Sequence, residues 1–436
     1  MTVIVFAMFA ILFSLLVAGM WIGLALAATG TLLLFLFRDI PLDKLLAQYA
    51  WNILTTQELL ALPLFIVMAE ILFRTRLSQS LFNGLSPWAG LLPGRLLHVN
   101  VIGCSLFAAI SGSSAATTQV VGRITLAELR RRGYRKSIAI GSLAGAGTLG
   151  FLIPPSNMLI IYGVLGDVSI LNLFAAGLVP GLVLASCFIA WIAIHTTIQK
   201  DLVPSAEREL THISMAERLR ALKNLAPVVS LIGAVLGSMY AGYATPSEAA
   251  AVGVLGALVV AAFQGGISLK VIRDIGIGSV LTCAMIAIIL LGASIFSGAV
   301  AFLGVAAAIA DFVASFELSP FLLIAAFVGV YLILGCFLDG LAMIVMTLPI
   351  VMPIVKASGF DPVWFGIFMV LVVEMAQITP PVGFNLFVIQ GLTGEGLGYV
   401  AKVTLPYLLI IVLVTLLITM FPQIALWLPQ VLASNR

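Results

Sequence analysis

Two short interruptions in apolar sequence are the parts of this chain best suited to chemistry. The first reads GFLIPPSN (residues 150–157) and the second reads QITPPVGFN (residues 377–385). Each Pro-Pro pair removes two backbone donors and disfavours a helical residue before it, so a helix must break there. A broken helix inside a membrane is tolerated only where its free backbone groups are buried in protein or line a polar cavity. The breaks therefore predict two clusters of free carbonyl and N–H groups that could bind an ion or a polar solute.

Small residues also interrupt two longer apolar runs upstream of the breaks. The run at residues 95–122 is interrupted at SGSS (111–114), and the run at residues 319–355 is interrupted at GCFLDG (335–340). Both runs are too long for one membrane crossing, so we interpret each as a re-entrant helical hairpin with its tip inside the membrane. Free carbonyl ends of half-helices favour a cation, and free N–H ends favour an anion such as a carboxylate.

Each hairpin and the break that follows it supply one set of candidate binding groups. The first set contains Ser111, Ser113, Ser114, Thr117, Gly150, Pro154, Pro155 and Asn157, and the second contains Gly335, Asp339, Thr379, Pro381, Gly383 and Asn385. Hydroxyls, amides and unwound carbonyls of this kind suit a hard monovalent cation such as Na⁺. Close helix packing is the alternative role for any single small residue. The pairing of two breaks with two small-residue hairpins favours a binding site.

Acidic residues are costly in apolar sequence, and three of them are informative. Asp339, at the second tip, either faces the site or is satisfied by local N–H groups. Glu374, shortly before the second break, either faces the cavity or pairs with a scaffold residue. Glu70 precedes Arg74 by four positions, which favours an ion pair on one helix face.

The composition places these segments in a membrane protein. Of the 436 residues, 62% are apolar and only 9% are charged, whereas soluble domains carry roughly 25% charged residues. Basic residues concentrate in residues 123–136 and 200–223, which we expect to face the cytoplasm, so the net charge of +3 reflects topology. Full spans are expected at residues 3–18, 20–37, 54–73, 136–165, 170–196, 225–244, 247–264, 276–299, 364–392 and 399–428.

The expected elements follow one order, used twice. Three spans precede an interfacial segment (residues 80–92 or 301–316), a hairpin, a broken span and a final span. Each half makes an odd number of crossings, so the second half enters from the opposite side. The predicted fold class is an all-α polytopic membrane protein, an inverted repeat with two re-entrant hairpins and two proline-broken helices.

Missing motifs argue against several functions. The chain has no GxxxxGK[ST] loop for ATP hydrolysis and neither an HExxH nor a GxSxG motif for proteolysis. No catalytic residue is therefore expected. An ion channel built on an inverted repeat remains an alternative, and it predicts conductance without a substrate.

Four motifs together resemble a known family. SGSSAAT (111–117), RRGY (131–134), the glycine-rich lead into IPPS (153–156) and TPPVG (379–383) look like the large membrane subunit of tripartite ATP-independent periplasmic (TRAP) transporters. The resemblance extends over essentially the whole chain, in length and in order of elements. It implies an elevator-type, ion-coupled transporter. The implied transport domain comprises residues 95–165 and 319–392, and the implied scaffold comprises residues 1–94, 166–318 (with a cytoplasmic linker near 197–224) and 393–436.

The resemblance also implies a coupling ion, partners and a substrate class. One Na⁺ site would involve Ser111, Ser114, Gly150, Ile153 and Pro155, largely through backbone oxygens, and the other would involve Gly335, Thr379 and Pro381. Substrate would then meet Ser113, Thr117, Pro154, Asn157, Asp339, Gly383 and Asn385. The implied partners are a small four-span membrane subunit and a periplasmic substrate-binding protein, which delivers an organic acid such as a C4-dicarboxylate or sialic acid to the bacterial inner membrane. A self-sufficient Na⁺/dicarboxylate symporter of related fold is the alternative.

Overall fold

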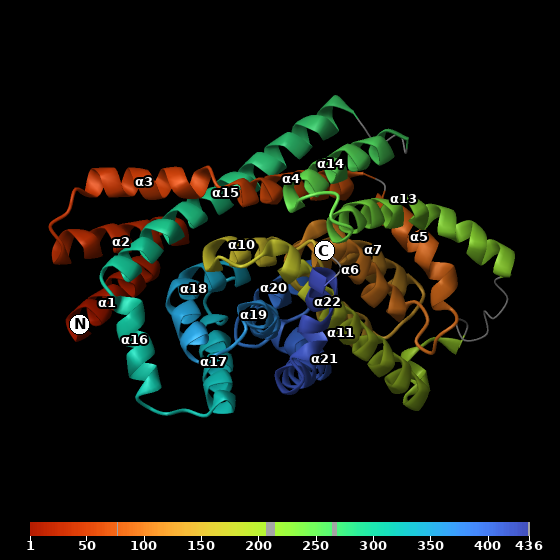
Figure 1. The fold of residues 1–436 in the computed structure, drawn as a ribbon. Helices are drawn as coiled ribbons and strands as arrows, with labels where there is room; N and C mark the ends of the chain where they lie inside the picture. Colours follow the sequence, from red (N-terminus) through yellow and green to blue (C-terminus); the bar gives the residue numbers. More distant parts are fainter. Residues whose placement is uncertain (76, 206–213, 264–267, 435–436) are drawn as a thin grey trace.

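The computed structural model describes residues 1–75, 77–205, 214–263 and 268–434, which form helices and no strand (Figure 1). The first half contains α1 (Thr2–Val17), α2 (Ile22–Phe37), α3 (Leu42–Leu54), the 3-10 helix η1 (Gln57–Leu60), α4 (Ala61–Arg74), α5 (Leu77–Ala89), α6 (Leu97–Ser111), α7 (Ser114–Arg131), α8 (Lys136–Gly147), α9 (Leu149–Leu152), α10 (Asn157–Gly166), α11 (Ile170–Ile198) and the 3-10 helix η2 (Lys200–Leu202). The second half contains α13 (Met215–Tyr240), α14 (Pro246–Phe263), α15 (Leu269–Phe302), α16 (Val305–Ala314), α17 (Pro320–Leu334), α18 (Gly340–Ala357), α19 (Pro362–Gln377), α20 (Phe384–Thr393), α21 (Leu397–Met420) and α22 (Gln423–Ser434).

The described helices are those of a multi-pass membrane protein. Within the described ranges, seven helical segments are long and apolar enough to cross a membrane, or eight if the bent pair formed by α3 with η1 and α4 is one span. Large apolar side chains are exposed along α1, α14, α15 and α21. Such surfaces are expected where lipid replaces water as the solvent.

Short polar side chains set where several helices begin. Ser113, Ser156 and Asp339 each accept a hydrogen bond from the backbone N–H three residues later, at the starts of α7, α10 and α18. Asp361 caps α19, whose first residue is Pro362. An N-cap oxygen satisfies one of the free donors of the first turn, and proline at the first helical position sacrifices no hydrogen bond. The starts of these helices are therefore specified locally by the sequence.

The predicted turns and breaks coincide with helix ends. Residues 112–113 separate α6 from α7, and residues 335–339 separate α17 from α18. Residues 153–156 separate α9 from α10, and residues 378–383 separate α19 from α20. The Pro-Pro peptide bond at each break is cis. The positions of all four interruptions are confirmed.

Helix α19 lies at the centre of the molecule and is buried over residues 364–377 (Figure 1). It packs on α11, α17, α18 and α21, and its contacts with α9 and α10 join the two halves of the chain. Helices α6 and α7 pack against each other and against α8 and α9. A hydrogen bond of 2.6 Å between the hydroxyls of Tyr331 and Thr347 links α17 to α18.

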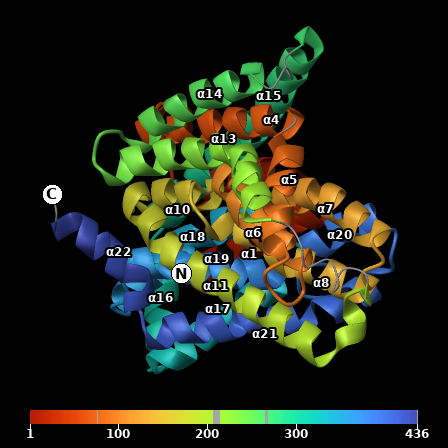
Figure 2. The same ribbon diagram turned by 90° about the vertical axis from the view of Figure 1, so that its right-hand side faces the viewer.

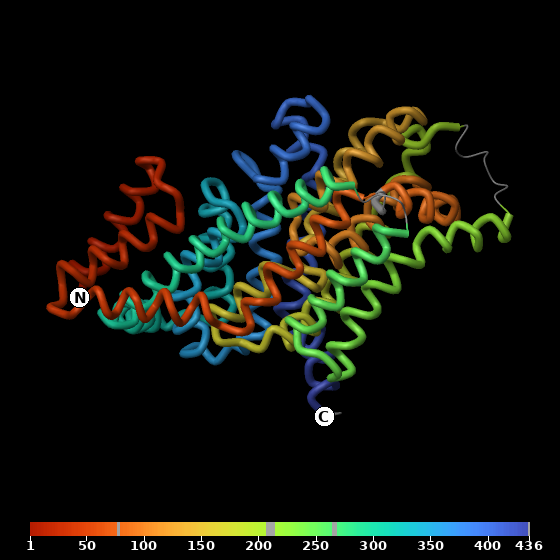
Figure 3. Tube along the Cα trace, turned by 90° about the horizontal axis from the view of Figure 1, so that it is seen from above, coloured from red at the N-terminus to blue at the C-terminus, as the bar shows by residue number. Residues whose placement is uncertain are grey.

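An outer layer of helices flanks this centre on one side. Helix α15 packs on α2, α3 and α4 and also reaches α18, while α13 and α14 pack on α5 and α4 (Figure 2). The molecule is elongated, with the N-terminal helices α1 and α2 at one end and the start of α13 near the other (Figure 3). Helices α4 and α15 pack on each other; α4 also contacts α6 and α10, and α15 contacts α18, so this layer touches both hairpins and the first broken helix.

Some helix bounds differ from the expected spans. No span is expected at residues 38–53, yet α3 forms there and packs on α15. Its polar residues (Asp43, Lys44, Gln48 and Asn52) weaken the apolar signal on which span assignment depends. Helices α13 and α15 also begin ahead of the spans expected at residues 225–244 and 276–299.

The final span is shorter than expected. One crossing is expected at residues 399–428, but α21 ends at Met420 and α22 begins at Gln423. Pro422 lies between them, and a proline cannot donate the backbone hydrogen bond that a continuous helix requires. The expected linker at residues 197–224, the end of the span at 247–264 and the end of the segment at 393–436 lie partly outside the described residues.

Candidate functional site

The tip of the first hairpin is a tight turn held by its own hydroxyls. Gly112 ends α6 in the left-handed region, with φ of 56°, which residues other than glycine rarely adopt. Ser111 Oγ lies 2.7 Å from Thr117 Oγ1 and accepts a hydrogen bond of 3.3 Å from the Ser113 N–H. The Ser111 and Thr117 side chains therefore join the end of α6 to the first turn of α7.

Asn157 attaches the first break to this tip. Its backbone N–H donates to the Gly112 carbonyl at 3.3 Å, and its side-chain amide donates to the Ser111 carbonyl at 3.5 Å. Gly150 packs on the tip from the other side of the break, since a Cβ there would lie 2.5 Å from Ser114 Cα. Hairpin tip and break therefore form one packed unit, which brings the expected site residues of the first half together.

A carboxylate from the second half of the chain enters this unit. Glu374, on α19, is fully buried. Its Oε1 accepts hydrogen bonds from the Ser114 hydroxyl and from the Phe151 N–H, the latter at 3.3 Å. Its Oε2 has no hydrogen-bond partner among the described residues. The partners of Glu374 are thus the first hairpin and the first break.

The second tip is organised by an acidic cap. Asp339 Oδ1 accepts a hydrogen bond of 3.3 Å from the Ala342 N–H. Of its two expected roles, the structure therefore shows the one in which a local N–H group satisfies the carboxylate. Gly335 lies against Ala376 of α19. The Thr379 hydroxyl donates to the backbone carbonyl four residues earlier at 2.6 Å, which leaves its oxygen lone pairs available as acceptors.

The two breaks differ in burial. Residues 151–160, around the first break, are all buried. At the second break Thr379 is half-buried, and Pro380 and Pro381 are exposed. The first break is therefore buried, whereas the second reaches the surface of the chain.

Several of the buried polar atoms that have no hydrogen-bond partner among the described residues lie near the breaks, and others lie elsewhere in the molecule. Neither polar atom of the Asn385 side chain has a hydrogen-bond partner among the described residues, although the side chain is fully buried. The same holds for Thr118 Oγ1 and for Gln377 Oε1. Buried polar groups are normally hydrogen-bonded, so these atoms are candidate contacts for a bound ion, a water molecule or a solute.

A cavity of about 620 Å³ lies where the two tips meet the outer helices. Ser111 and Ser113 line it from the first tip, and Asp339 lines it from the second. Asn157 and Gln377 reach it from the two breaks, while α4 and α15 supply the opposite wall. Four elements that are distant in sequence thus converge on one cavity, whose volume suits a small organic molecule.

The remaining expected residues lie outside the cavity lining. Those of the first half are buried within or beside the packed unit of tip and break: Ser114, Thr117, Gly150, Ile153, Pro154 and Pro155. Those of the second half surround the second tip and the second break: Gly335, Thr379, Pro381, Gly383 and Asn385. Of the residues expected to meet substrate, the structure places Ser113, Asn157 and Asp339 on the cavity wall.

Arg123 of α7 adds a positively charged side chain to the cavity, a role that its membership of the basic cluster at residues 123–136 does not reveal. Ala116, Gln119 and Arg123 line the cavity at helical spacing, and the Arg123 side chain is exposed. Residues three and four apart lie on the same face of a helix. The spacing of Ala116, Gln119 and Arg123 is therefore the sequence signal that places Arg123 on the helix face that lines the cavity. A guanidinium at this position suits recognition of a carboxylate.

The wall opposite α7 contains the expected ion pair of α4. Arg74 Nε lies 2.8 Å from Glu70 Oε2, which confirms the predicted pair, and Glu70 lines the cavity. Gly278 of α15 allows this pair to fit between the helices, because a Cβ there would lie 2.7 Å from Glu70 Oε2. The pairing reduces the negative charge that this wall presents to an anionic ligand.

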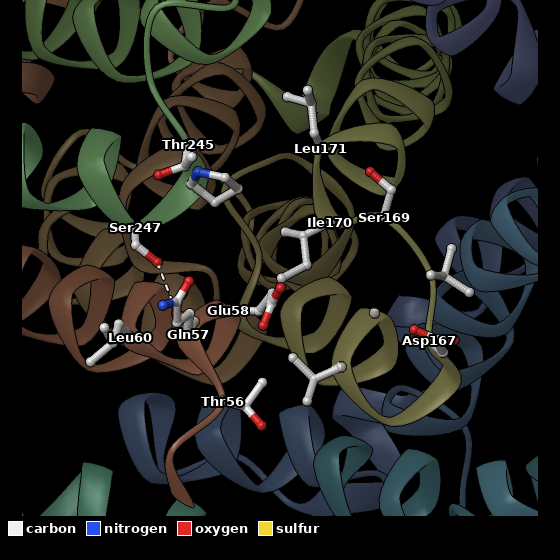
Figure 4. A pocket seen from close by; sticks show the side chains of 14 residues that line it. Thr56, Gln57, Glu58, Leu60, Asp167, Ser169, Ile170, Leu171, Thr245 and Ser247 are labelled. Carbon is white, nitrogen blue, oxygen red and sulfur yellow. Dashed lines mark hydrogen bonds between the residues drawn. The ribbon is translucent and has the colours of Figure 1, made fainter. Parts of the chain in front are cut away.

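A second cavity, of about 580 Å³, lies at another place in the molecule (Figure 4). Gln57 and Glu58 of η1, Asp167 after α10 and Ser247 of α14 line it, and the Ser247 hydroxyl donates to the Gln57 carbonyl at 3.2 Å. Glu58 and Asp167 are exposed. Its described lining includes none of the expected site residues, so the cavity at the hairpin tips is the candidate functional site.

Comparison with known proteins relates the chain to transport proteins. Residues 9–424 match the family described as "Tripartite ATP-independent periplasmic transporter, DctM component". The chain is 33% identical over 422 residues to the C4-dicarboxylate TRAP transporter large permease protein DctM of Pseudomonas aeruginosa, covering 94% of this chain and 95% of that protein. It is 30% identical over 421 residues to the sialic acid TRAP transporter large permease protein SiaM of Vibrio cholerae, covering 95% and 96% respectively. These relatives are transporter permeases, not enzymes.

The fold is also similar to that of a transporter of known structure. The crystal structure of the YdaH transporter of Alcanivorax borkumensis superimposes with a TM-score of 0.62 over 88% of each chain, at 14% sequence identity. At this identity the likeness concerns the fold alone.

Proposed function

Because this chain belongs to the DctM family, the large permease components of tripartite ATP-independent periplasmic transporters, we propose that it is the membrane-embedded transport subunit of a binding-protein-dependent secondary transporter. It couples the influx of Na⁺ to the uptake of an organic acid. The observation that carries this proposal is the shared cavity on which both hairpin tips and both broken helices converge.

The substrate we propose is a small carboxylate. Helices α7 and α18 begin at the two tips beside the cavity. Ser113 and Asp339 each satisfy one first-turn N–H there, and the N–H groups that stay free at a helix N-terminus favour an anion. Arg123 adds a full positive charge at the same cavity. The relatives named for a C4-dicarboxylate and for sialic acid handle carboxylates, which agrees with this chemistry.

The donor groups around the breaks fit Na⁺ as the coupling ion. The proposed first site uses Ser111, Ser114, Gly150, Ile153 and Pro155, and the proposed second site uses Gly335, Thr379 and Pro381. Two observations support the fit. Thr118 Oγ1 and Glu374 Oε2 are buried acceptors with no hydrogen-bond partner among the described residues, and Gly150 lies directly against the backbone of Ser114. Bound Na⁺ would supply positive charge at the tips and, through its gradient, the driving force for uptake.

We further propose that the two walls of the cavity belong to bodies that move relative to each other, as an elevator. One wall is made by α4 and α15, which belong to the proposed scaffold with α1–α3, α13 and α14. The other is made by the hairpins and broken helices. Helices α11 and α21 pack on α8 and α19, and α11 also packs on α6 and α9, so we place both helices with the mobile body. Their addition extends the transport domain beyond residues 95–165 and 319–392.

The proposed assembly includes two partners. A small four-span membrane subunit would support the scaffold, and a periplasmic substrate-binding protein would deliver the organic acid. The chain would reside in the bacterial inner membrane, with the basic residues of 123–136 on the cytoplasmic side. The two halves would form an inverted repeat, so that the hairpins enter from opposite sides.

The test is uptake of a radiolabelled organic acid into proteoliposomes that contain this chain and its small membrane subunit. The gradient of Na⁺ and the binding protein are each supplied or omitted. Uptake that requires both supports the proposal. Uptake with Na⁺ but without the binding protein would instead establish a self-sufficient symporter, and current without substrate would establish a channel.

A further inference from the structure

The carboxylate of Glu374 has an unusual environment for a group inside a membrane protein. It is fully buried in the central helix α19, and both of its identified donors come from the other half of the chain. Those donors, the Ser114 hydroxyl and the Phe151 N–H, share the oxygen Oε1. Oε2 has no hydrogen-bond partner among the described residues.

The protein alone leaves this group incomplete in either charge state. An ionised carboxylate with two neutral donors retains a buried negative charge, which is costly without a positive partner. A neutral carboxyl group would carry a hydroxyl or a carbonyl at Oε2 that has no hydrogen-bond partner among the described residues. A cation at Oε2 satisfies both the charge and the unpartnered oxygen.

The surroundings of Glu374 suit a small cation. Its donor Ser114 begins α7, and Thr118, one turn later on the same helix, has a buried hydroxyl oxygen with no described partner. Gly150, immediately before Phe151, lies against the Ser114 backbone without a side chain between them. Hydroxyl, backbone and carboxylate oxygens are the ligands that hard cations prefer.

We propose that Glu374 supplies the negative charge of the cation site at the first hairpin, so that this site is completed by a residue from the second half of the chain. The inference rests on the proposed Na⁺ coupling and deepens it. Ser114 and the Phe151 N–H hold one carboxylate oxygen in place, and the other oxygen faces the ion. Because Glu374 lies five residues before Thr379 of the proposed second site, the same helix end meets both proposed sites.

The test measures Na⁺ binding without transport. The complex of this chain with its small membrane subunit is purified in detergent, and its melting temperature is followed against NaCl, with choline chloride keeping the ionic strength constant. For the wild type we expect saturable stabilisation by Na⁺. For Glu374→Gln we expect the NaCl concentration at half-maximal stabilisation to rise by at least about tenfold, since loss of a supporting carboxylate weakens metal sites by that order.

A matched control separates this effect from any loss of a carboxylate. Glu395→Gln makes the same chemical change at a residue outside α19, after the end of α20, whose described partner is Lys136 at 2.6 Å. It should keep the wild-type NaCl midpoint. Glu374→Asp retains the charge on a shorter side chain, and its midpoint should lie between those of the wild type and Glu374→Gln.

Each outcome decides a different question. A wild type that Na⁺ does not stabilise would overturn the Na⁺ coupling of the proposed function itself. A stabilised wild type with the same midpoint in Glu374→Gln would overturn only the role of Glu374. If Glu374→Gln does not yield a monodisperse complex, Glu374→Asp decides: a right-shifted midpoint supports the proposal, and an unchanged midpoint contradicts it.

Discussion

Replacing Gly150 with alanine should separate the first hairpin from the first broken helix. In the structure a Cβ at residue 150 would lie 2.5 Å from Ser114 Cα, 2.6 Å from Ser114 N and 2.7 Å from the carbonyl carbon of Ser113. All three neighbours are backbone atoms, which cannot rotate away as a side chain would. The added methyl group can therefore be accommodated only if the tip and the broken helix move apart.

The size of the effect follows from these distances. Carbon atoms in contact prefer about 3.5–4.0 Å, so the backbone must move by about 1 Å. Overpacking of this kind costs about 1–3 kcal/mol. If overpacking destabilises only the conformation that binds the coupling ion, the affinity for this ion drops by about 5- to 150-fold. This range follows because 1.4 kcal/mol corresponds to a factor of ten in affinity.

The assay combines Na⁺-dependent melting of the purified complex with uptake in proteoliposomes. Gly150→Ala should insert into the membrane normally, melt at a lower temperature and require more NaCl for half-maximal uptake. The matched control is Gly237→Ala on α13, where a Cβ would meet no atom within 4 Å. A Gly150→Ala variant that equals the control in both measurements would refute the argument that this close contact forms the site.

Three further predictions concern residues around the cavity and the end of α7. Asn157→Leu removes the side-chain amide that donates a hydrogen bond to the first tip. We expect this change to destabilise the tip by about 1–3 kcal/mol and to impair uptake while membrane insertion stays normal. Normal uptake would show that Asn157 is not part of the site. Arg123→Gln should raise the KM for the organic acid more than it lowers kcat. The difference in KM between variant and wild type should shrink at high salt, because salt screens the attraction between Arg123 and the carboxylate. An unchanged KM would contradict a substrate-facing role. Glu128 accepts hydrogen bonds of 2.7 Å from Arg131 and Arg132 at the end of α7, which lower the pKa of its carboxyl below the ordinary value. This stabilisation is present at pH values above the pKa of Glu128 in the unfolded chain and is lost as the pH falls through the lowered pKa of the folded chain. Glu128→Gln should therefore lower the melting temperature at pH 7 and match the wild type at acidic pH. The corresponding loss in free energy of unfolding should not exceed about 1 kcal/mol, because these ion pairs lie near the surface; an equal deficit at both pH values would assign the effect to packing.

Much of the fold was predictable because membrane insertion imposes strong local rules. Proline cannot continue a helix, so the breaks at residues 154–155 and 380–381 were evident from the chain. Small residues in the middle of apolar runs located both hairpin turns. Segments with mixed polarity were harder, and α3 was missed because its polar positions resemble those of a loop, while its contact with α15 is what favours the helix.

The candidate site was only partly predictable, because side-chain partners depend on packing. Asp339 had two open roles, and the structure shows that it caps α18 while also lining the cavity. Arg123 belonged to a basic cluster in the sequence, yet the direction of α7 turns it toward the cavity. Glu374 had no identifiable partner, since its donors lie more than two hundred positions earlier in the chain.

The sequence by itself determined that this is a multi-pass helical membrane protein, where its helices break and which residues stand at the tips and breaks. These features follow from hydropathy, proline geometry and helix capping, which act over a few residues. Only the tertiary structure decided that two tips and two breaks share one cavity, that the first break is buried while the second is exposed, and that Glu374 reaches across to Ser114. Such contacts depend on how α19 packs between the two halves of the chain, and no local pattern encodes that packing.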